Sequence, residues 1–515
     1  METPPLSHAR DISRPGFYVK LLLMGLINAF GIYGILACYG QQRWGILIFL
    51  AISLAVADFI YFSKRAVPAK YLFPGLIFLI VYQVYVMGMT GYVAFTNYGD
   101  GHSDNKEHAI TQILATSETE GDVQLPLTIV ERDGELGFAV VRDGKPLYGT
   151  AEKALEPLDG AQVEGDKVTE IDGASVLSLQ DIVARQDEVL NLRVPMSDDA
   201  NDGSLRTRNG STATQATPSM RYDEAKDTFT STDGKVYTAD DSVGNYVSDS
   251  GEKLEPGWQV NVGFKNFAFL FTNSEVSKFF LGSLGWTFAF AFLSVFTTFA
   301  LGLIIAVIYN DPRVKGRVLY RSLFILPYAF PGFLAALVWK GMLNRQFGYI
   351  NQTLLGGASI DWLGDGNLAK LSILMVNLWL GFPYMFLICT GALQSIPGEL
   401  TEAGIMDGAG PLKRFFNVTL PMLMVSVAPL LISSFAFNFN NFSLIYMLTG
   451  GGPVYPEAPF NVGETDILIS MVYAISFESD KNYGVASALS IIIFVVVGII
   501  AWLGFRQTRK LEEIM

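Results

Sequence analysis

Residues 402–421 read EAGIMDGAGPLKRFFNVTLP and predict two short helices joined by a tight turn. Glu402 favours the positive end of the first helix, and Ala403–Gly404 leave a small-residue face that another surface can approach closely. Gly408 is suited to the left-handed conformation that ends a helix, and Pro411 is suited to open the next one. The stretch is either a plain connector between two spans or a helix–turn–helix that another protein contacts.

Eight apolar runs flank this stretch, and most reach the roughly 20 residues that a transmembrane helix needs. Half of the 515 residues are apolar, 17% are charged, and the mean hydropathy is +0.33. The seventh run contains Pro429 and is expected to be broken or tilted. The runs predict an all-α polytopic membrane protein with eight transmembrane helices. They are residues 17–39, 44–62, 71–95, 281–309, 319–342, 370–394, 419–448 and 485–505.

Basic residues in the short loops orient these spans, because they favour the cytoplasmic side. Eight single crossings place all five basic clusters on that side, together with both termini. Residues 10–38 also resemble a cleaved signal peptide ending at Cys38, but a second apolar run follows at once, which favours an uncleaved helix. The clusters are Arg10, Arg14 and Lys20; Lys64, Arg65 and Lys70; Arg313, Lys315, Arg317 and Arg321; Lys413 and Arg414; and Arg506, Arg509 and Lys510.

Residues 97–275 interrupt the apolar runs and predict a soluble β-rich domain outside the cytoplasm. They hold 33 acidic and 15 basic residues, a net charge of −18, whereas the rest of the chain carries +5. Short β-prone runs alternate with turn signals such as Asp143–Gly144 and Asp172–Gly173. Val176–Leu190 is the best helix candidate, and residues 197–220 are expected to form a flexible loop. The domain either binds a partner or is an inert spacer.

The expected organisation has four parts. Residues 1–70 hold two transmembrane helices, residues 71–96 hold the third, and residues 97–275 form the insert. Residues 276–515 form a core of five transmembrane helices with a cytoplasmic loop at 395–418.

Composition excludes several function classes. A net charge of −13 disfavours nucleic-acid binding, because phosphate backbones recruit Lys and Arg. Two cysteines, Cys38 and Cys389, cannot make a disulfide framework or a zinc cluster, and three histidines near the N-terminus and in one loop give no membrane metal site. The chain has no phosphate-binding G-x-x-x-x-G-K-[ST] loop and no catalytic constellation.

Polar residues inside the predicted spans mark a candidate binding site, since they are costly in lipid unless they face a partner or a cavity. Ser434, Asn438 and Asn441 have the i, i+4, i+7 spacing of one helical face. The asparagine amides donate and accept hydrogen bonds, as sugar hydroxyls require. Gly381–Tyr384 contains a proline that frees backbone carbonyls, and Tyr328 lies between two further prolines. The alternative is that these groups only join neighbouring helices.

Residues 402–421 resemble the membrane subunits of bacterial ATP-binding-cassette importers. The family pattern is Glu-Ala-Ala, three residues, Gly, nine residues, Ile-x-Leu-Pro, and the chain departs from it only at Gly404 and Val418. Ala94–Tyr98, Val262–Phe267 and Thr449–Pro453 are similar to motifs of carbohydrate permeases. The large insert after a third span resembles the larger permease subunits of maltose importers, a type I ABC importer family.

The resemblance implies partners and residue roles. The partners are a smaller permease subunit, two copies of a cytoplasmic ABC ATPase and a periplasmic maltose-binding protein that the insert holds. ATP and Mg would bind the ATPase, and this chain would bind no cofactor or metal and catalyse no reaction. Matching positions for the maltose or maltodextrin pocket are Tyr328, Leu380, Gly381, Tyr384, Ser434, Phe437, Asn438 and Asn441. Matching positions for ATPase coupling are Glu402, Ala403, Gly404, Asp407 and Gly408.

Three other functions are alternatives to maltose import. The same machinery would carry another oligosaccharide only with a changed pocket, and the pocket residue types are the expected ones. A membrane-anchored sugar sensor needs a cytoplasmic signalling domain, whereas Arg506–Met515 is a stub. An ion-coupled transporter would favour ionisable residues in mid-span, and the clearest one, Asp58, lies near a span end.

Overall fold

The computed structural model describes residues 15–63, 67–132, 134–158, 160–171, 173–311, 313–458, 460–478 and 481–514. Four of the basic residues used for orientation, Arg10, Arg14, Lys64 and Arg65, lie outside the described residues, as does Asp172 of one predicted turn. The chain divides into two units, residues 1–90 and 91–515, and each is described by itself.

The first unit is built from apolar helices. They are α1 (Pro15–Gly40), α2 (Trp44–Phe62), α3 (Val67–Leu79) and the π-helix η2 (Ile80–Val84), which continues into α4 (Tyr85–Val93). The helices α1 and α2 pack closely, because a Cβ on Gly31 would lie only 3.0 Å from the Leu54 side chain. Inside this hairpin, Asn28 Nδ2 donates a hydrogen bond of 2.9 Å to Asp58 Oδ1. The one ionisable group noted in the first spans is therefore paired within its own helix hairpin.

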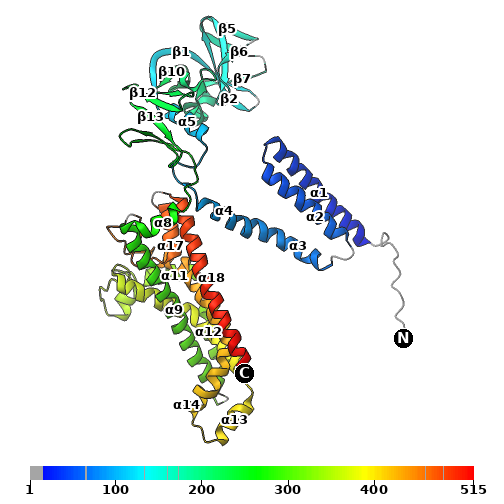
Figure 1. The fold of residues 1–515 in the computed structure, drawn as a ribbon, viewed down its shortest axis with the longest axis vertical. Helices are drawn as coiled ribbons and strands as arrows, with labels where there is room; N and C mark the ends of the chain where they lie inside the picture. The colour runs from blue at the N-terminus through cyan, green and yellow to red at the C-terminus, as the bar shows by residue number, and fades with distance from the viewer. Residues whose placement is uncertain are drawn as a thin grey trace. The chain divides into compact units, whose positions relative to one another are not determined.

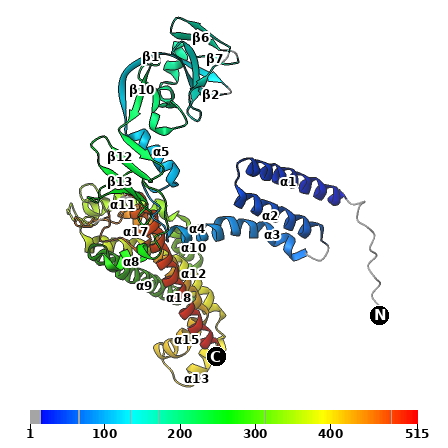
Figure 2. The ribbon, with the colours of Figure 1, turned by 45° about the horizontal axis from the view of Figure 1, so that its top comes forward.

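Helices carry the core of the second unit (Figure 1). They are α8 (Lys265–Thr272), α9 (Ser274–Asn310), α10 (Arg317–Ala329), α11 (Gly332–Met342), α12 (Gly366–Ser395), α13 (Gly398–Met406), α14 (Pro411–Arg414), α15 (Leu420–Phe439), α16 (Phe442–Leu448), α17 (Leu468–Tyr473) and α18 (Tyr483–Ile514). Three π-helices join them: η4 (Ile350–Leu354), η5 (Phe415–Thr419) and η6 (Ala474–Glu478). Figure 2 shows α13 at the same end of this core as the C-terminal end of α18.

Across the described residues, seven helices are long and apolar enough to cross a membrane, and the bent pair α10–α11 makes eight if it counts as one span. The prediction of a continuous fifth span over 319–342 is wrong, since α10 and α11 are bent by 90°. Phe330 between them is extended, with φ −81° and ψ 134°. The cause is Pro331, because a residue before proline is disfavoured in the helical region.

The seventh run is broken, but not at Pro429, which lies inside the continuous helix α15. The break comes at Asn440 and Asn441, where α15 ends and α16 begins. Asn441 is the N-cap of α16 and accepts a hydrogen bond of 3.4 Å from the backbone N–H of Leu444. Two asparagines, which favour caps over helix interiors, therefore decide where this run turns.

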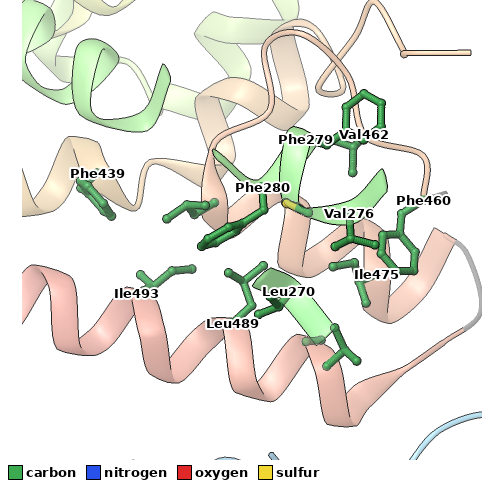
Figure 3. Close-up of a cluster of buried hydrophobic side chains, with 14 of the residues drawn as sticks. Leu270, Val276, Phe279, Phe280, Phe439, Phe460, Val462, Ile475, Leu489 and Ile493 are labelled. Carbon is green, nitrogen blue, oxygen red and sulfur yellow. The ribbon is translucent and has the colours of Figure 1, made fainter. Parts of the chain in front are cut away.

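A small residue brings the core helices α9 and α12 together. A Cβ on Gly302 of α9 would lie 2.7 Å from the backbone nitrogen of Phe386 in α12. Figure 3 shows a second contact region, where Phe280 of α9, Leu270 of α8 and Leu489 of α18 meet in one buried apolar cluster. Burial of such side chains stabilises the packing of these helices by about 1.5–3 kcal/mol each.

The insert folds as β-sheets, which confirms its β-rich prediction. The largest sheet has eight antiparallel strands in the order β4-β3-β2-β1-β10-β9-β8, with β7 on β1, and a five-stranded sheet runs from β11 to β15. The strands are β1 (Glu118–Arg132), β2 (Glu135–Arg142), β3 (Lys145–Thr150), β4 (Glu156–Pro157), β5 (Ala161–Glu164), β6 (Lys167–Ile171), β7 (Ser175–Val176), β8 (Val194–Pro195), β9 (Ser204–Thr207), β10 (Thr212–Pro218), β11 (Met220–Asp223), β12 (Thr228–Ser231), β13 (Val236–Asp240), β14 (Asn245–Ser248) and β15 (Lys253–Leu254).

Two predictions within the insert need correction. Residues 197–220 are not a flexible loop, because β9 and β10 of this segment pair with each other and β10 pairs with β1. In these two strands Leu205, Ala213 and Ala216 are fully buried. The predicted helix over Val176–Leu190 divides into α6 (Leu179–Ala184) and α7 (Gln186–Asn191). A third helix, α5 (Lys106–Thr116), was not predicted and begins after the N-cap Asn105.

The two permease-like motifs that flank the insert come together in space. Thr96 and Asn261 form a β-bridge, and the backbone N–H of Val262 donates to Phe95 O at 2.8 Å. The side chain of Asn266 donates to Ala94 O and to Thr96 O, at 2.9 and 2.7 Å. Residues 94–98 and 261–266 therefore form a neck, which holds the two ends of the insert side by side.

Candidate functional site

A cavity of about 800 Å³ opens between the core helices. Its walls come from α9, α10, α11, α12, α15 and α16, so it is formed where the two interrupted helices meet the long ones. It is lined by Thr298, Pro327, Tyr328, Phe330, Gly332, Phe333, Asn377, Leu380, Gly381, Tyr384, Met385, Ser433, Ser434, Phe437, Asn438, Asn440, Asn441, Phe442, Ser443 and Leu444.

All eight residues that the sequence places in a sugar pocket line this one cavity. Tyr328 comes from α10; Leu380, Gly381 and Tyr384 come from α12; and Ser434, Phe437 and Asn438 come from α15. Asn441 reaches it from the corner between α15 and α16. The expectation that Asn441 shares one helical face with Ser434 is therefore wrong, although the helix break leaves its side chain at the same cavity.

Amide groups form a connected network in the cavity wall. Asn377 Nδ2 donates a hydrogen bond of 3.0 Å to Asn438 Oδ1, and Asn438 Nδ2 donates to Ser434 O at 2.8 Å. Asn441 Nδ2 lies 3.5 Å from Asn377 Oδ1 and donates to it. Ser434, Asn377 and Asn438 are buried. Three amides from three positions are thus held toward one another, which limits the orientations that each can adopt.

Asn377 was missed by the sequence reasoning. It stands in the sixth predicted span at i, i+4, i+7 with Gly381 and Tyr384. A polar residue at that spacing on an apolar helix is the same signal that was used for Asn438.

Aromatic rings cover the other walls of the cavity. The rings of Tyr328 and Tyr384 stack with centroids 6.2 Å apart and an interplanar angle of 16°. Phe437 has 70% of its surface exposed, although it lies on an apolar helix. Gly381 lets α12 approach α9, because a Cβ there would lie 2.9 Å from Thr298 Cγ2. The cavity therefore offers exposed ring faces beside a hydrogen-bonding wall.

The cavity chemistry suits a neutral ligand rich in hydroxyl groups. Among the described residues that line it, none is Asp, Glu, Lys, Arg or His. Amides and hydroxyls supply donors and acceptors without charge, and aromatic faces pack against apolar C–H faces. An ion or a charged metabolite would find no counter-charge in this lining.

The cytoplasmic loop predicted at residues 395–418 contains two short helices, α13 and α14, as predicted. The helix α13 ends in a Schellman turn: Ala409 N–H donates to Gly404 O at 2.9 Å, and Gly408 N–H donates to Ile405 O at 2.9 Å. Gly408 has φ +73°, and α14 begins at Pro411.

Its predicted coupling residues are mostly exposed. Glu402, Ala403, Asp407 and Gly408 are exposed on or just after α13, whereas Gly404 is half-buried. A Cβ on Gly404 would lie 3.3 Å from Arg414 Cγ. Gly404 therefore lies where α13 contacts α14, and the other four predicted coupling residues are exposed.

Two family models match the chain. Residues 77–152 match the family described as "N-terminal of TM subunit in PBP-dependent ABC transporters". Residues 298–509 match the family "Binding-protein-dependent transport system inner membrane component". The second match contains the cavity residues and the coupling stretch.

Curated relatives match over nearly the whole chain. The "Maltose/maltodextrin transport system permease protein MalF" of Vibrio parahaemolyticus is 33% identical over 96% of this chain and 96% of its own length. The protein of the same name from Escherichia coli K12 is 34% identical over 95% of this chain and 96% of its own. Among solved structures, a bacterial ABC transporter involved in the import of alginate has a TM-score of 0.42 and 22% identity, covering 48% of this chain and 84% of that one.

The membrane-spanning helices, the family matches and the full-length relatives define a multi-pass inner-membrane permease subunit of a binding-protein-dependent ABC importer. Within that class, the chain belongs to the family of MalF-type permeases of the type I ABC importers.

Proposed function

We propose that this permease subunit translocates maltose and maltodextrins through the cavity between its core helices. The observation that carries the proposal is the uncharged lining, in which three linked asparagines share one cavity with exposed Phe437 and the stacked pair Tyr328 and Tyr384. Glucose units present hydroxyls around their edges and C–H groups on their faces, and this wall offers a partner for each.

The cavity volume supports a small oligosaccharide. Ligand pockets of about 300–1,000 Å³ enclose drug-sized molecules, and this cavity measures about 800 Å³. Tyr328, Leu380, Gly381, Tyr384, Ser434, Phe437, Asn438 and Asn441 are proposed to contact the sugar, and Asn377 is proposed to join them. The remaining lining residues shape the walls.

The transport energy comes, in this proposal, from a separate ATPase. Two copies of that ATPase bind ATP and Mg, and this chain binds no cofactor. The ATPase surface receives α13 and its turn, where Glu402, Asp407 and Gly408 are exposed. A second, smaller permease subunit completes the membrane assembly, and a periplasmic maltose-binding protein delivers the sugar.

The proposed orientation places both termini and α13 in the cytoplasm and residues 97–275 in the periplasm. In the helical core, α13 lies at the same end as the C-terminal end of α18 (Figure 2). Closure of the ATPase would move α13 and rock the core helices, so that the cavity opens first outward and then inward. Such coupling requires both sites to have different contacts in the two states.

The test uses the full assembly. The chain is co-expressed with its smaller permease subunit and ATPase and reconstituted in liposomes. ATP hydrolysis is then measured with binding protein that is empty, loaded with maltose, or loaded with another oligosaccharide. Strong stimulation by the maltose-loaded protein supports the proposal.

Two results would revise it. Stimulation only by another loaded sugar would keep the importer mechanism and replace the cargo. If no ATPase co-purifies, and substitutions at Glu402 and Gly408 change nothing, the coupling proposal fails, and a sensor or an ion-coupled mechanism must be considered.

A further inference from the structure

A row of six aromatic side chains runs from the cavity to the neck of the insert. The aromatic row consists of Phe442, Tyr446, Tyr473, Phe477, Tyr483 and Tyr98. Phe442 lines the cavity, and Tyr98 directly follows the neck motif at Thr96. The members come from α16, α17, η6, α18 and the segment after α4, so the row is assembled from elements that are distant in sequence.

The rings are in contact in an unbroken series. Phe442 and Tyr446 are stacked, with centroids 5.0 Å apart, and Phe442 also lies 5.0 Å from Tyr473. The centroids of Tyr473 and Phe477 are 5.1 Å apart, and those of Phe477 and Tyr483 are 6.3 Å apart. Tyr483 and Tyr98 complete the series at 5.4 Å. These separations are typical of favourable aromatic pairs.

Each member of the row is at least partly accessible. Phe477 has 60% of its surface exposed, and the other five members are only partly buried. The backbone favours this exposure, because Phe477 stands in the π-helix η6, and such single-turn irregularities are frequent at functional sites. At the far end, Gly484 N–H donates to Tyr98 O at 2.9 Å, which holds the last two rings in place.

Two hydroxyl groups give the row polar atoms beside its ring faces. The hydroxyl oxygens of Tyr446 and Tyr473 lie 3.4 Å apart. Each hydroxyl is therefore a hydrogen-bond partner of the other and keeps acceptor capacity for a further bond. Sugar hydroxyls can bond to these groups while the pyranose faces stack on the rings.

We propose that the aromatic row is a second binding surface, along which the glucose units of longer maltodextrins stack between the neck of the insert and the cavity. The inference rests on the proposed function and extends it to ligand length. Maltose fits within the cavity and has no unit left for the row. A seven-unit maltodextrin extends beyond the cavity and would use the row.

The test compares two labelled sugars in the reconstituted full assembly. Uptake of maltose and of maltoheptaose is measured with saturating loaded binding protein for wild type, Phe477→Leu and Tyr473→Leu. Leucine keeps apolar bulk but removes the ring face. We expect maltoheptaose uptake to fall roughly threefold to tenfold, with maltose uptake within about twofold of wild type.

Matched variants separate ring stacking from packing. Phe477→Tyr keeps the ring and should retain maltoheptaose uptake, and Tyr473→Phe keeps the ring without the hydroxyl and should transport maltoheptaose faster than Tyr473→Leu. Phe494→Leu is the control off the row, since Phe494 of α18 is 63% exposed and its loss should leave both sugars unaffected.

Four outcomes overturn the inference. If the row variants transport both sugars as wild type does, or lose both equally, the row is a packing surface against the second permease subunit or lipid. A wild-type assembly that transports maltose but not maltoheptaose also excludes the row as a sugar path, while the proposed function stands. A wild-type assembly that transports neither sugar overturns the proposed function and this inference together.

Discussion

Asn377 and Asn438 are joined by a hydrogen bond of 3.0 Å that crosses from α12 to α15 in the cavity wall. Both side chains are buried, so the bond forms away from bulk water. Asn438 also donates to Ser434 O at 2.8 Å, and this second bond fixes the amide within its own helix. The pair therefore positions polar atoms for a ligand and links two helices that must move if the cavity alternates.

Asn377→Ala is expected to reduce maltose uptake roughly ten- to hundredfold, because it leaves the buried Asn438 oxygen without its donor. The measurement is the initial rate of maltose uptake by the reconstituted assembly. Ser372→Ala is the matched control, because Ser372 is a buried polar residue of the same helix, donates to Trp362 O at 3.2 Å and does not line the cavity. Equal loss in both variants would mean that Asn377 serves only to pack α12.

Gly302→Ala is expected to destabilise the chain, because the new Cβ would lie 2.7 Å from the Phe386 backbone nitrogen. Backbone atoms cannot move aside as a side chain can, so overpacking should cost at least about 1–3 kcal/mol. Thermal unfolding in detergent would show the loss as a lower midpoint. Gly285→Ala on the same helix has nothing within 4 Å of its Cβ and should behave as wild type. Similar midpoints for the two variants would contradict the close contact between α9 and α12.

Gly408→Ala is expected to impair coupling while leaving the cavity intact. A Cβ at φ +73° meets no neighbour, so the cost is the left-handed backbone itself, about 1–2 kcal/mol. We expect a lower ATP hydrolysis rate with loaded binding protein and an unchanged substrate preference. Gly408→Asn should be milder, because asparagine tolerates this conformation.

Gly404→Ala is the control for this turn, since its Cβ would meet only the flexible Arg414 side chain, at 3.3 Å. The Gly404→Ala assembly should keep the wild-type rate of ATP hydrolysis with loaded binding protein. Coupling that survives Gly408→Ala but fails in Gly404→Ala would show that the α13–α14 contact matters and the Schellman turn does not.

Local signals in the sequence predicted the spans and part of the cavity lining, and the family resemblance indicated the other pocket positions. Apolar length alone located the spans, and polar residues in apolar helices located Ser434 and Asn438. The break at Asn440–Asn441 was misplaced to Pro429, because a proline in a long helix can be accommodated, whereas two asparagines end one. Asn377 was not predicted, although it is also a polar residue within an apolar span.

The insert was harder to predict because its strands depend on distant partners. Residues 204–218 contain many Ser and Thr, which resemble a loop by composition. In the fold, β10 of this stretch pairs with β1, about ninety residues earlier, and β9 pairs with β10, where Thr207 Oγ1 donates to Thr212 O at 2.7 Å. Burial of small polar residues inside a sheet has no short-range signal, since their hydrogen bonds form only after the strands pair.

Asp466 gives a pH-dependent prediction for the loop between α16 and α17. Burial raises its pKa to about 6, and the nearby charge of Glu478 adds to the rise, although hydrogen bonds from Ser470 Oγ and Gly463 N–H act in the opposite direction. The folded chain therefore binds a proton that the unfolded chain, with an ordinary aspartate pKa near 4, has released.

Stability should consequently fall as pH rises from about 4 to about 6 and level off above that range, by on the order of 3 kcal/mol in total. Thermal midpoints of the detergent-solubilised chain between pH 4.5 and 7.5 would measure this slope. Asp466→Asn keeps an acceptor for Gly463 and cannot ionise, so its midpoint should vary less with pH than that of wild type. Glu464→Gln alters a half-buried carboxylate two residues away and should preserve the wild-type slope. An unchanged slope in Asp466→Asn would show that another group titrates, and that Asp466 remains ionised throughout.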